Sequence, residues 1–252
     1  MKVKKMMVDT YIILVINFMS MRTAIIPYIV IAIILPLGFT YLVSLAFKNM
    51  ITVEAATNML VGVIVLSLSL SIINGIGQNL GQDRLLKRLE LIASYPVSPG
   101  AYILGVSTVF IVSSLINISV MVFSGGAAWN ILDRVLHVFP QLLALSLTAS
   151  LGLIGIGAVI GTRSSNLPQT YALTNIVSFT IAMLTPAYYP IEIMPSPIRL
   201  LSQFIPTTHA ALIARSLLGV GQYDIEKHTV LLVLLTSIYL LIGFRGIKWY
   251  EE

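Results

Sequence analysis

Hydrophobic residues along this chain gather in long runs, and short polar segments separate the runs. An α-helix needs about 20 apolar residues to cross a hydrocarbon core about 30 Å thick, and six runs reach that length. The pattern therefore predicts an all-α polytopic membrane protein with six transmembrane helices. The expected spans cover residues 24–47, 56–76, 101–123, 138–160, 170–189 and 229–247.

The composition agrees with this pattern. Of the 252 residues, 57% are hydrophobic and only 10% are charged, whereas soluble domains carry about 25% charged residues. Six spans leave no room for a large soluble domain, so residues 1–252 are expected to form a single transmembrane domain. The net charge of +5 comes from dispersed basic residues without interleaved aromatic side chains, a pattern that argues against nucleic-acid binding.

Residues 83–99 carry the densest charge in the chain. Burying five ionisable side chains in lipid would cost more than about 10 kcal/mol, so the segment must lie at or outside the membrane surface. Its apolar residues recur at three- and four-residue spacing, which predicts an amphipathic helix with Asp83 paired to Lys87. Pro96 is expected to end this helix. The five charged residues are Asp83, Arg84, Lys87, Arg88 and Glu90.

The distribution of lysine and arginine predicts the topology. With the N-terminus inside, ten of the 15 basic residues fall on the inner side, as the positive-inside rule requires. Six spans then place both termini and residues 83–99 in the cytoplasm. Residues 1–22 combine three early lysines with an apolar run too short to cross, so they are expected to form an interfacial helix at the cytoplasmic surface.

The outer segment at residues 190–221 is apolar but broken by prolines. It predicts a re-entrant or interfacial hairpin of two half-helices of about 9–11 residues each, joined at residues 206–208. Irregular backbone at membrane depth is tolerated only where protein buries it or where it lines a cavity. Arg199 and Arg215 either face that pathway or extend to the interface, and the second is favoured. The pathway candidates are Pro190, Pro195, Arg199, Pro206, Thr207 and Arg215.

Several kinds of chemistry find no support in the sequence. No ionisable residue lies in the middle of an expected span, which argues against a secondary carrier, although sodium sites built from backbone carbonyls leave that class open. Three histidines lie in three outer segments without metal-binding spacing, and there is no cysteine, so no metal site is expected. The chain has no G-x-x-x-x-G-K-[ST] loop for ATP.

Two stretches together resemble a known family. Leu89-Glu90 is followed by Pro96-Val97-Ser98, and residues 189–215 combine Tyr-Pro, Met-Pro, Ile-Arg-Leu-Leu-Ser, Ile-Pro-Thr and Ala-Arg. With six spans, these stretches are similar to the permease subunit of ABC-2 type transporters, which include drug-export permeases of the daunorubicin-resistance kind. One departure is Lys87-Arg88, where family members often have Gly-Thr.

The resemblance implies a function as well as a fold. Residues 83–99 would contain a coupling helix that docks into a separate ATP-binding subunit, which would hold ATP and Mg²⁺. Two permease chains, expected to be a homodimer, would form a pathway that exports an amphipathic or hydrophobic compound across the plasma membrane. No residue here would be catalytic, and no cofactor is expected in this chain. The coupling residues would be Arg84, Lys87, Arg88, Leu89, Glu90 and Pro96.

Other functions are also considered. A secondary carrier or channel that is not coupled to ATP is the main alternative, and an intramembrane enzyme or a non-transporting assembly protein is a further one. Transport by the purified chain without any ATPase would favour the carrier or channel.

Overall fold

The computed structural model describes residues 52–94 and 99–246 continuously, with isolated positions between residues 10 and 45. The expected interfacial helix at 1–22 and the first expected span at 24–47 lie outside the continuously described part. Pro96 also lies outside the described residues.

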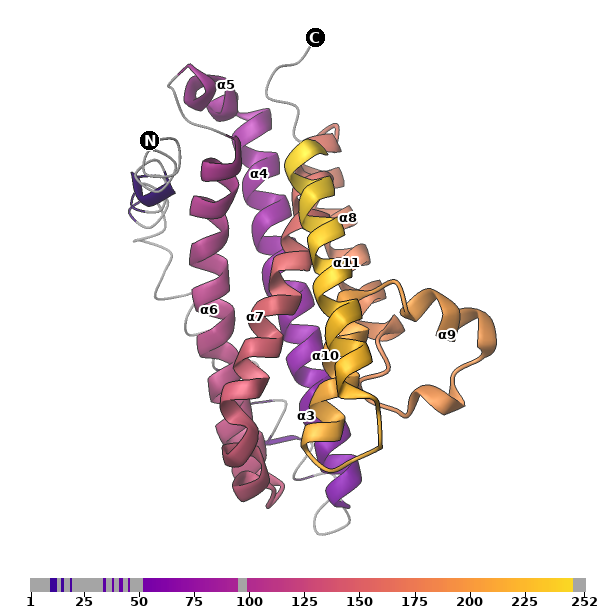
Figure 1. Ribbon diagram of the computed structural model, residues 1–252. Coiled ribbons are helices and arrows are strands. Elements are labelled where there is room, and N and C mark those ends of the chain that lie inside the picture. The colour runs from indigo at the N-terminus through magenta and orange to yellow at the C-terminus, as the bar shows by residue number, and fades with distance from the viewer. Residues whose placement is uncertain are drawn as a thin grey trace.

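The long helices of the described residues run roughly along one common axis, and α9 projects from their side (Figure 1). The first is a continuous rod of 33 residues from Val53 to Leu85, which includes one π-helical turn. The elements are α3 (Val53–Ser69), η1 (Leu70–Asn74), α4 (Gly75–Leu85), α5 (Arg88–Ala93), α6 (Pro99–Ala128), α7 (Leu132–Arg163), α8 (Leu167–Leu184), η2 (Ile191–Ile193), α9 (Ser196–Ser202), α10 (Pro206–Leu217) and α11 (Ile225–Gly246).

Local signals in the sequence start these helices. The side chain of Thr52 accepts a hydrogen bond from the backbone N–H of Ala55 and caps α3. Asn166 caps α8 in the same way through the N–H of Gln169, and a proline follows in the first turn. Both caps satisfy backbone donors that a helix start leaves without an intrahelical partner.

Four helices in the described part are long and apolar enough to cross a membrane, so the chain is a multi-pass membrane protein. They overlap the predicted spans at 56–76, 101–123, 138–160 and 229–247, and each of them begins before its predicted start. The fifth predicted span, 170–189, corresponds to α8, which has 18 residues and ends at Leu184. Helix α8 is not among these four helices, so its crossing of the membrane stays a prediction. The four helices are Val53–Leu85, Gly100–Ala128, Leu132–Arg163 and Ile225–Gly246.

Helix α7 packs against both α4 and α11, and glycines make both contacts close. A Cβ atom on Gly161 would lie 2.5 Å from the carbonyl oxygen of Gly77 in α4. On another side of α7, a Cβ on Gly155 would collide with the backbone carbonyl of Tyr239 in α11. Small residues therefore let three helix backbones approach one another, as is typical of membrane helix packing.

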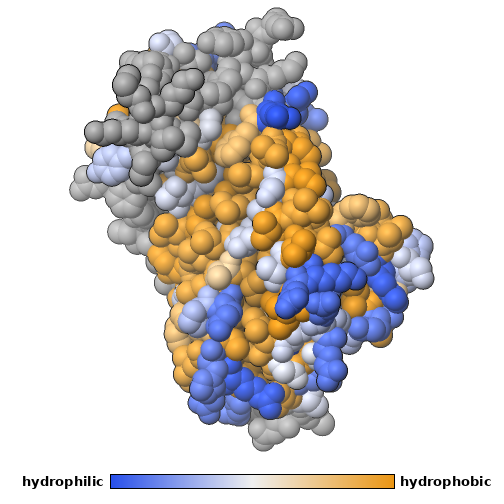
Figure 2. All heavy atoms as spheres, viewed as in Figure 1, coloured by the Kyte–Doolittle hydropathy of each residue, from blue (hydrophilic) through white to orange (hydrophobic). Residues whose placement is uncertain are grey.

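The two segments singled out by the sequence lie in different parts of the bundle. In Figure 1, α5 lies at the upper end of the bundle, where α11 also ends, whereas α9 and α10 lie in the lower half. Figure 2 shows a largely hydrophobic surface across the middle of this face, with hydrophilic residues gathered below. This arrangement is consistent with residues 83–94 and 190–221 on opposite sides of a membrane.

Candidate functional site

The segment predicted as one amphipathic helix is broken into two helices. Helix α4 ends at Leu85 and α5 begins at Arg88, because Lys87 has a left-handed backbone with φ of 58°. A non-glycine residue in this region costs about 1–2 kcal/mol. Burial of Leu89, which is 1% exposed, favours this bend. We call residues 83–93 the elbow.

A buried carboxylate anchors the elbow to α6. Asp83 is buried, accepts a hydrogen bond from the hydroxyl of Tyr102 and lies 3.5 Å from Nη1 of Arg88. The predicted pairing of Asp83 with Lys87 is therefore wrong. It assumed an unbroken helix, whereas the bend at Lys87 brings Arg88 to Asp83 instead.

Arg84 anchors the same elbow to α7. Its Nη1 donates hydrogen bonds to the carbonyl oxygens of Thr162 and Ser164, each at 2.9 Å. These carbonyls lie at the C-terminal end of α7, where oxygens lack intrahelical partners and a positive charge is stabilising. Arg84 therefore holds the two helix ends together.

Five elbow residues form an exposed surface that combines charged and apolar side chains. Of the predicted coupling residues, Lys87, Arg88 and Glu90 are exposed, whereas Leu89 belongs to the core. Two large apolar side chains accompany the charged ones, with Leu86 54% and Leu91 64% exposed. We call this set, Leu86, Lys87, Arg88, Glu90 and Leu91, the elbow surface.

A row of polar side chains connects η1 and α4 to α8. Residues 74, 78 and 82 recur at four-residue spacing, so they lie on one face of the helix. Each binds a polar residue of α8, and we call the three pairs the polar ladder. They are Asn74 Nδ2 with Asn175 Oδ1 (3.1 Å), Gln78 Nε2 with Thr174 Oγ1 (3.3 Å) and Gln82 Nε2 with the Tyr171 hydroxyl (2.8 Å).

The polar ladder follows directly after the π-helical turn. A π turn adds a residue and changes which side chains face a neighbour, and such turns are frequent at functional sites. Asn74, its last residue, also accepts a hydrogen bond from Ser178 at 3.2 Å. Sequence reasoning misses Gln78 and Gln82 as site residues, although their spacing after Asn74 is a usable signal.

The segment predicted to form a hairpin of two half-helices contains two short helices. Helix α9 has 7 residues and α10 has 12. The break precedes Pro206, which lies in the first turn of α10, so the predicted junction at residues 206–208 is too late. This position suits a proline, because the first turn of a helix needs no donor there.

Arg215 lies in the interior of the hairpin. It is 1% exposed, and its Nη1 donates to the carbonyl oxygens of Tyr189 at 2.8 Å and Pro186 at 3.4 Å. Its guanidinium also lies 5.7 Å from the centre of the Tyr223 ring. The favoured prediction that Arg215 extends to the interface is wrong, because irregular backbone before η2 leaves carbonyls that this side chain binds.

The other hairpin candidates have mainly local partners. Arg199 Nη2 donates to the carbonyl oxygens of Glu192 at 2.6 Å and Met194 at 3.0 Å, which fixes the turn ahead of α9. The hydroxyl of Thr207 lies 2.7 Å from that of Thr185 and is buried. Pro206 is also buried, whereas Pro190 is partly exposed and Pro195 is exposed.

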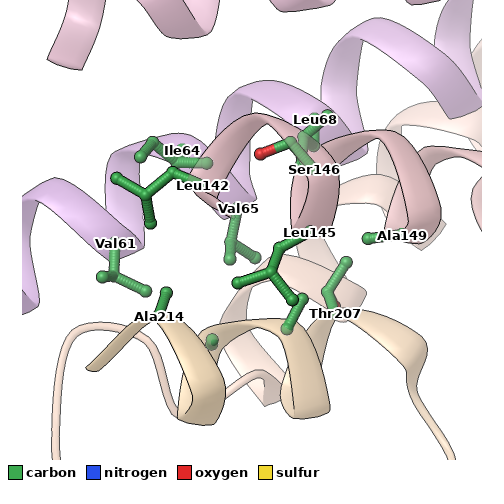
Figure 3. A pocket seen from close by; sticks show the side chains of 12 residues that line it. Val61, Ile64, Val65, Leu68, Leu142, Leu145, Ser146, Ala149, Thr207 and Ala214 are labelled. Atoms are coloured by element: carbon green, nitrogen blue, oxygen red, sulfur yellow. The ribbon is translucent and has the colours of Figure 1, made fainter. Parts of the chain in front are cut away.

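A small apolar cavity of about 20 Å³ lies between α3, α7 and α10 (Figure 3). Val61 and Val65 come from α3, Leu142 from α7, and Thr207 and Ala214 from α10. A space of this size holds about one water molecule. It is too small for a transported compound, so we interpret it as a packing defect.

The structure brings together two of the three histidines that the sequence leaves apart. Nδ1 of His209 in α10 lies 2.9 Å from Nδ1 of His228 in α11. Within the described residues, no group of three or more possible metal ligands surrounds them.

Comparison with protein families supports the interpretation drawn from these elements. The model of the ABC-2 family transporter proteins matches residues 52–245, a range that contains the elbow, the polar ladder and the hairpin. Comparison with curated proteins finds no match. Because the match covers most of the sequence, the chain belongs to the ABC-2 family of transporter proteins.

Proposed function

We propose that this chain is the membrane subunit of an exporter driven by a separate ATP-binding subunit, with two copies of the chain enclosing the pathway. The family supplies the coarser statement, that of an ABC transporter membrane subunit. The polar ladder is the observation that supports the finer statement, an export pathway enclosed by two copies of the chain, because it is a row of uncharged polar groups within the helices of a membrane protein.

The position of the ladder favours a covered or hydrated face over a lipid-facing one. The Asn74–Asn175 and Gln82–Tyr171 pairs are both exposed on the single chain. Each amide has two donor hydrogens and an acceptor oxygen, so the two hydrogen bonds that Asn74 and Asn175 each make leave part of this capacity to be satisfied. Unsatisfied polar groups in hydrocarbon cost several kcal/mol, so a second chain or a hydrated pathway against this face would lower the free energy.

The elbow supports coupling to a partner that supplies the energy. Its surface offers two cations, an acid and two leucines to a partner, while Asp83 and Arg84 connect it to α6 and α7. A force on α5 would therefore move three long helices together. ATP and Mg²⁺ would be held by the partner, and this chain would contribute no catalytic group.

The chemistry of the ladder favours an amphipathic cargo. Its members are amides and hydroxyls without formal charge, and the helices that carry them are otherwise largely apolar. Such a face hydrogen-bonds neutral polar groups and contacts apolar ones.

We place the complex in the plasma membrane with both termini in the cytoplasm, because the positive-inside count favours that orientation.

Transport by reconstituted vesicles tests this proposal. We expect vesicles that contain the chain and its ATP-binding subunit to move an amphipathic dye only when ATP is supplied. The double variant Gln78→Leu and Asn175→Leu should reduce that rate severalfold, whereas Thr148→Val, outside the ladder, should not. Equal dye movement by the chain alone, without ATP, would favour a secondary carrier or channel.

A further inference from the structure

A pair of histidines joins the outer hairpin to the last membrane helix. His209 is 1% exposed in α10, and His228 is partly buried in the first turn of α11. Their Nδ1 atoms are 2.9 Å apart, and Nε2 of His209 lies 2.9 Å from the carbonyl oxygen of Gln203. The imidazoles therefore connect α10, α11 and the turn after α9.

The hydrogen bonds determine which nitrogen carries each proton. A carbonyl oxygen only accepts, so Nε2 of His209 must donate to Gln203. Neutral His209 then has an unprotonated Nδ1, which accepts a hydrogen bond from the Nδ1–H of His228. This assignment leaves Nε2 of His228 as the nitrogen that can take up a further proton.

The pair can accept one proton without losing its bond. Protonation of Nε2 on His228 leaves its Nδ1–H pointing at His209, and a charge-assisted hydrogen bond is stronger than a neutral one. A second proton has only Nδ1 of His209 to occupy. Two N–H groups and two positive charges would then face each other across 2.9 Å, and like charges at such a distance repel.

The surroundings oppose that second protonation near neutral pH. Burial lowers the pKa of His209 and is the largest effect; the hydrogen bond to the Gln203 carbonyl raises this pKa, and the neighbouring His228 and Lys227 lower it. The folded chain therefore binds fewer protons than the unfolded chain between the lowered pKa and the ordinary one. Stability is lost as the pH falls through that interval.

Other charged groups also lie on the elements around the pair. Tyr223 packs edge-on to His228 at 6.4 Å and its hydroxyl lies 3.4 Å from Glu192, while Asp224 precedes α11. These carboxylates favour a charged imidazole, and the cations oppose it. The ionisable residues of the packed elements are Glu54 on α3, Asp133, Arg134, His137 and Arg163 on α7, Tyr171 on α8, Glu192 on η2, Arg199 on α9, Arg215 on α10, Tyr223 and Asp224 before α11, and Glu226, Lys227, Tyr239 and Arg245 on α11.

We propose that His209 and His228 form an acid-sensitive latch, which holds the hairpin against α11 until both imidazoles are protonated. Opening would separate α10 from the start of α11, while Nε2–H of His209 keeps its hydrogen bond to the Gln203 carbonyl. The proposal concerns this contact alone and does not depend on what the chain transports.

Pulsed electron paramagnetic resonance tests the latch directly. The chain has no cysteine, so Leu201→Cys in α9 and Val230→Cys in α11, at positions 58% and 66% exposed, would carry the only spin labels. The full chain would be studied in lipid nanodiscs with excess unlabelled chain, at about pH 7.5 and about pH 4.5, on either side of the ordinary histidine pKa. We expect one distance at neutral pH and an additional, longer distance in acid.

Asparagine variants separate the latch from other acid effects. His209→Asn and His228→Asn place a polar atom near the former Nδ1 but cannot become charged, so each should abolish the longer distance. His137→Asn, at the third histidine, should keep it. An unchanged distance in the parent chain, or an equal acid response in His209→Asn, would overturn the proposal.

A second measurement needs no substitution at the pair. Nitrogen NMR of labelled histidine in the parent chain should show His209 protonated at Nε2 near neutral pH, with Nδ1 protonated only where the longer distance appears. Protonation of Nδ1 without a change in distance would also overturn the latch.

Discussion

The hydroxyl of Tyr102, in the first turns of α6, donates a hydrogen bond to the buried carboxylate of Asp83 near the end of α4. This hydrogen bond therefore joins the two helices on either side of the elbow, α4 before it and α6 after it. Helix α5 has only 6 residues, too few for an isolated helix to be stable in water. Its position depends on these side-chain contacts more than on its own propensity.

Removal of the Tyr102 hydroxyl should loosen the elbow. Tyr102→Phe removes a donor from the buried carboxylate of Asp83, and a buried acceptor that loses its donor costs about 1–3 kcal/mol. We expect a lower Tm for the purified chain in detergent. Tyr171→Phe, which removes an exposed partner of Gln82, is the matched control and should change Tm less. Equal Tm shifts in the two variants would show that the buried hydrogen bond stabilises the chain no more than the exposed one.

Arg215 should not tolerate replacement by lysine. A lysine ammonium group is compact and strongly hydrated, so burying it costs more than burying the guanidinium whose Nη1 donates to the carbonyls of Pro186 and Tyr189. Arg215→Lys should make the hairpin more sensitive to limited proteolysis and reduce the folded yield. Arg199→Lys, at a more exposed arginine with similar carbonyl contacts, should have a smaller effect. A larger effect at Arg199 would contradict the role assigned to burial.

A methyl group at Gly155 should separate α7 from α11. The added Cβ meets backbone atoms of Tyr239, which cannot rotate away. We expect Gly155→Ala to destabilise the chain by about 1–3 kcal/mol, as overpacking does. Gly100→Ala, where a Cβ finds open space, should leave Tm unchanged or raise it, because alanine favours helix by up to about 1 kcal/mol. Equal stability of the two variants would contradict this packing.

Leu142 should be more sensitive than its lipid-facing neighbour. It is 2% exposed beside the small cavity, so Leu142→Ala enlarges an existing void and should cost about 2–5 kcal/mol. Leu147 on the same helix is 41% exposed, and lipid can fill the space that Leu147→Ala leaves. Denaturant unfolding of the two variants in micelles would measure the difference, and similar losses would argue against the core position of Leu142.

The sequence predicts the membrane helices well because their signal is long and local. Helices α6 and α7 cover the predicted runs at 101–123 and 138–160 and extend beyond both ends of each run. Asp133 and Arg163 lie within α7, in its first and last turns, where charges reach the interface and helix ends tolerate them. Hydropathy alone underestimates such helices, because it treats any charged residue as the end of a span.

The candidate site is less predictable because its contacts join distant residues. Nothing in the sequence around Lys87 marks a left-handed residue, since neither glycine nor proline is present. The pairing of His209 with His228 depends on how α10 packs against α11. The polar ladder is partly predictable. The sequence shows the spacing of Asn74, Gln78 and Gln82, but it does not show their partners on α8.

The structure also shows which charge reversal tests partner docking without disturbing the elbow. Arg84 and Arg88 bind groups of this chain, so their reversal would disturb the elbow itself. Lys87 is exposed, and Lys87→Glu changes the charge that a partner would meet. Lys227→Glu provides an exposed control before the last span.

The most direct measurement is the amount of ATPase with a G-x-x-x-x-G-K-[ST] loop that co-purifies with each form of the chain from native membranes. We predict near-equal recovery with the parent chain and Lys227→Glu, and severalfold less with Lys87→Glu. Recovery of no such ATPase with any form, or undiminished recovery with Lys87→Glu, would contradict docking of an ATP-binding subunit at the elbow surface.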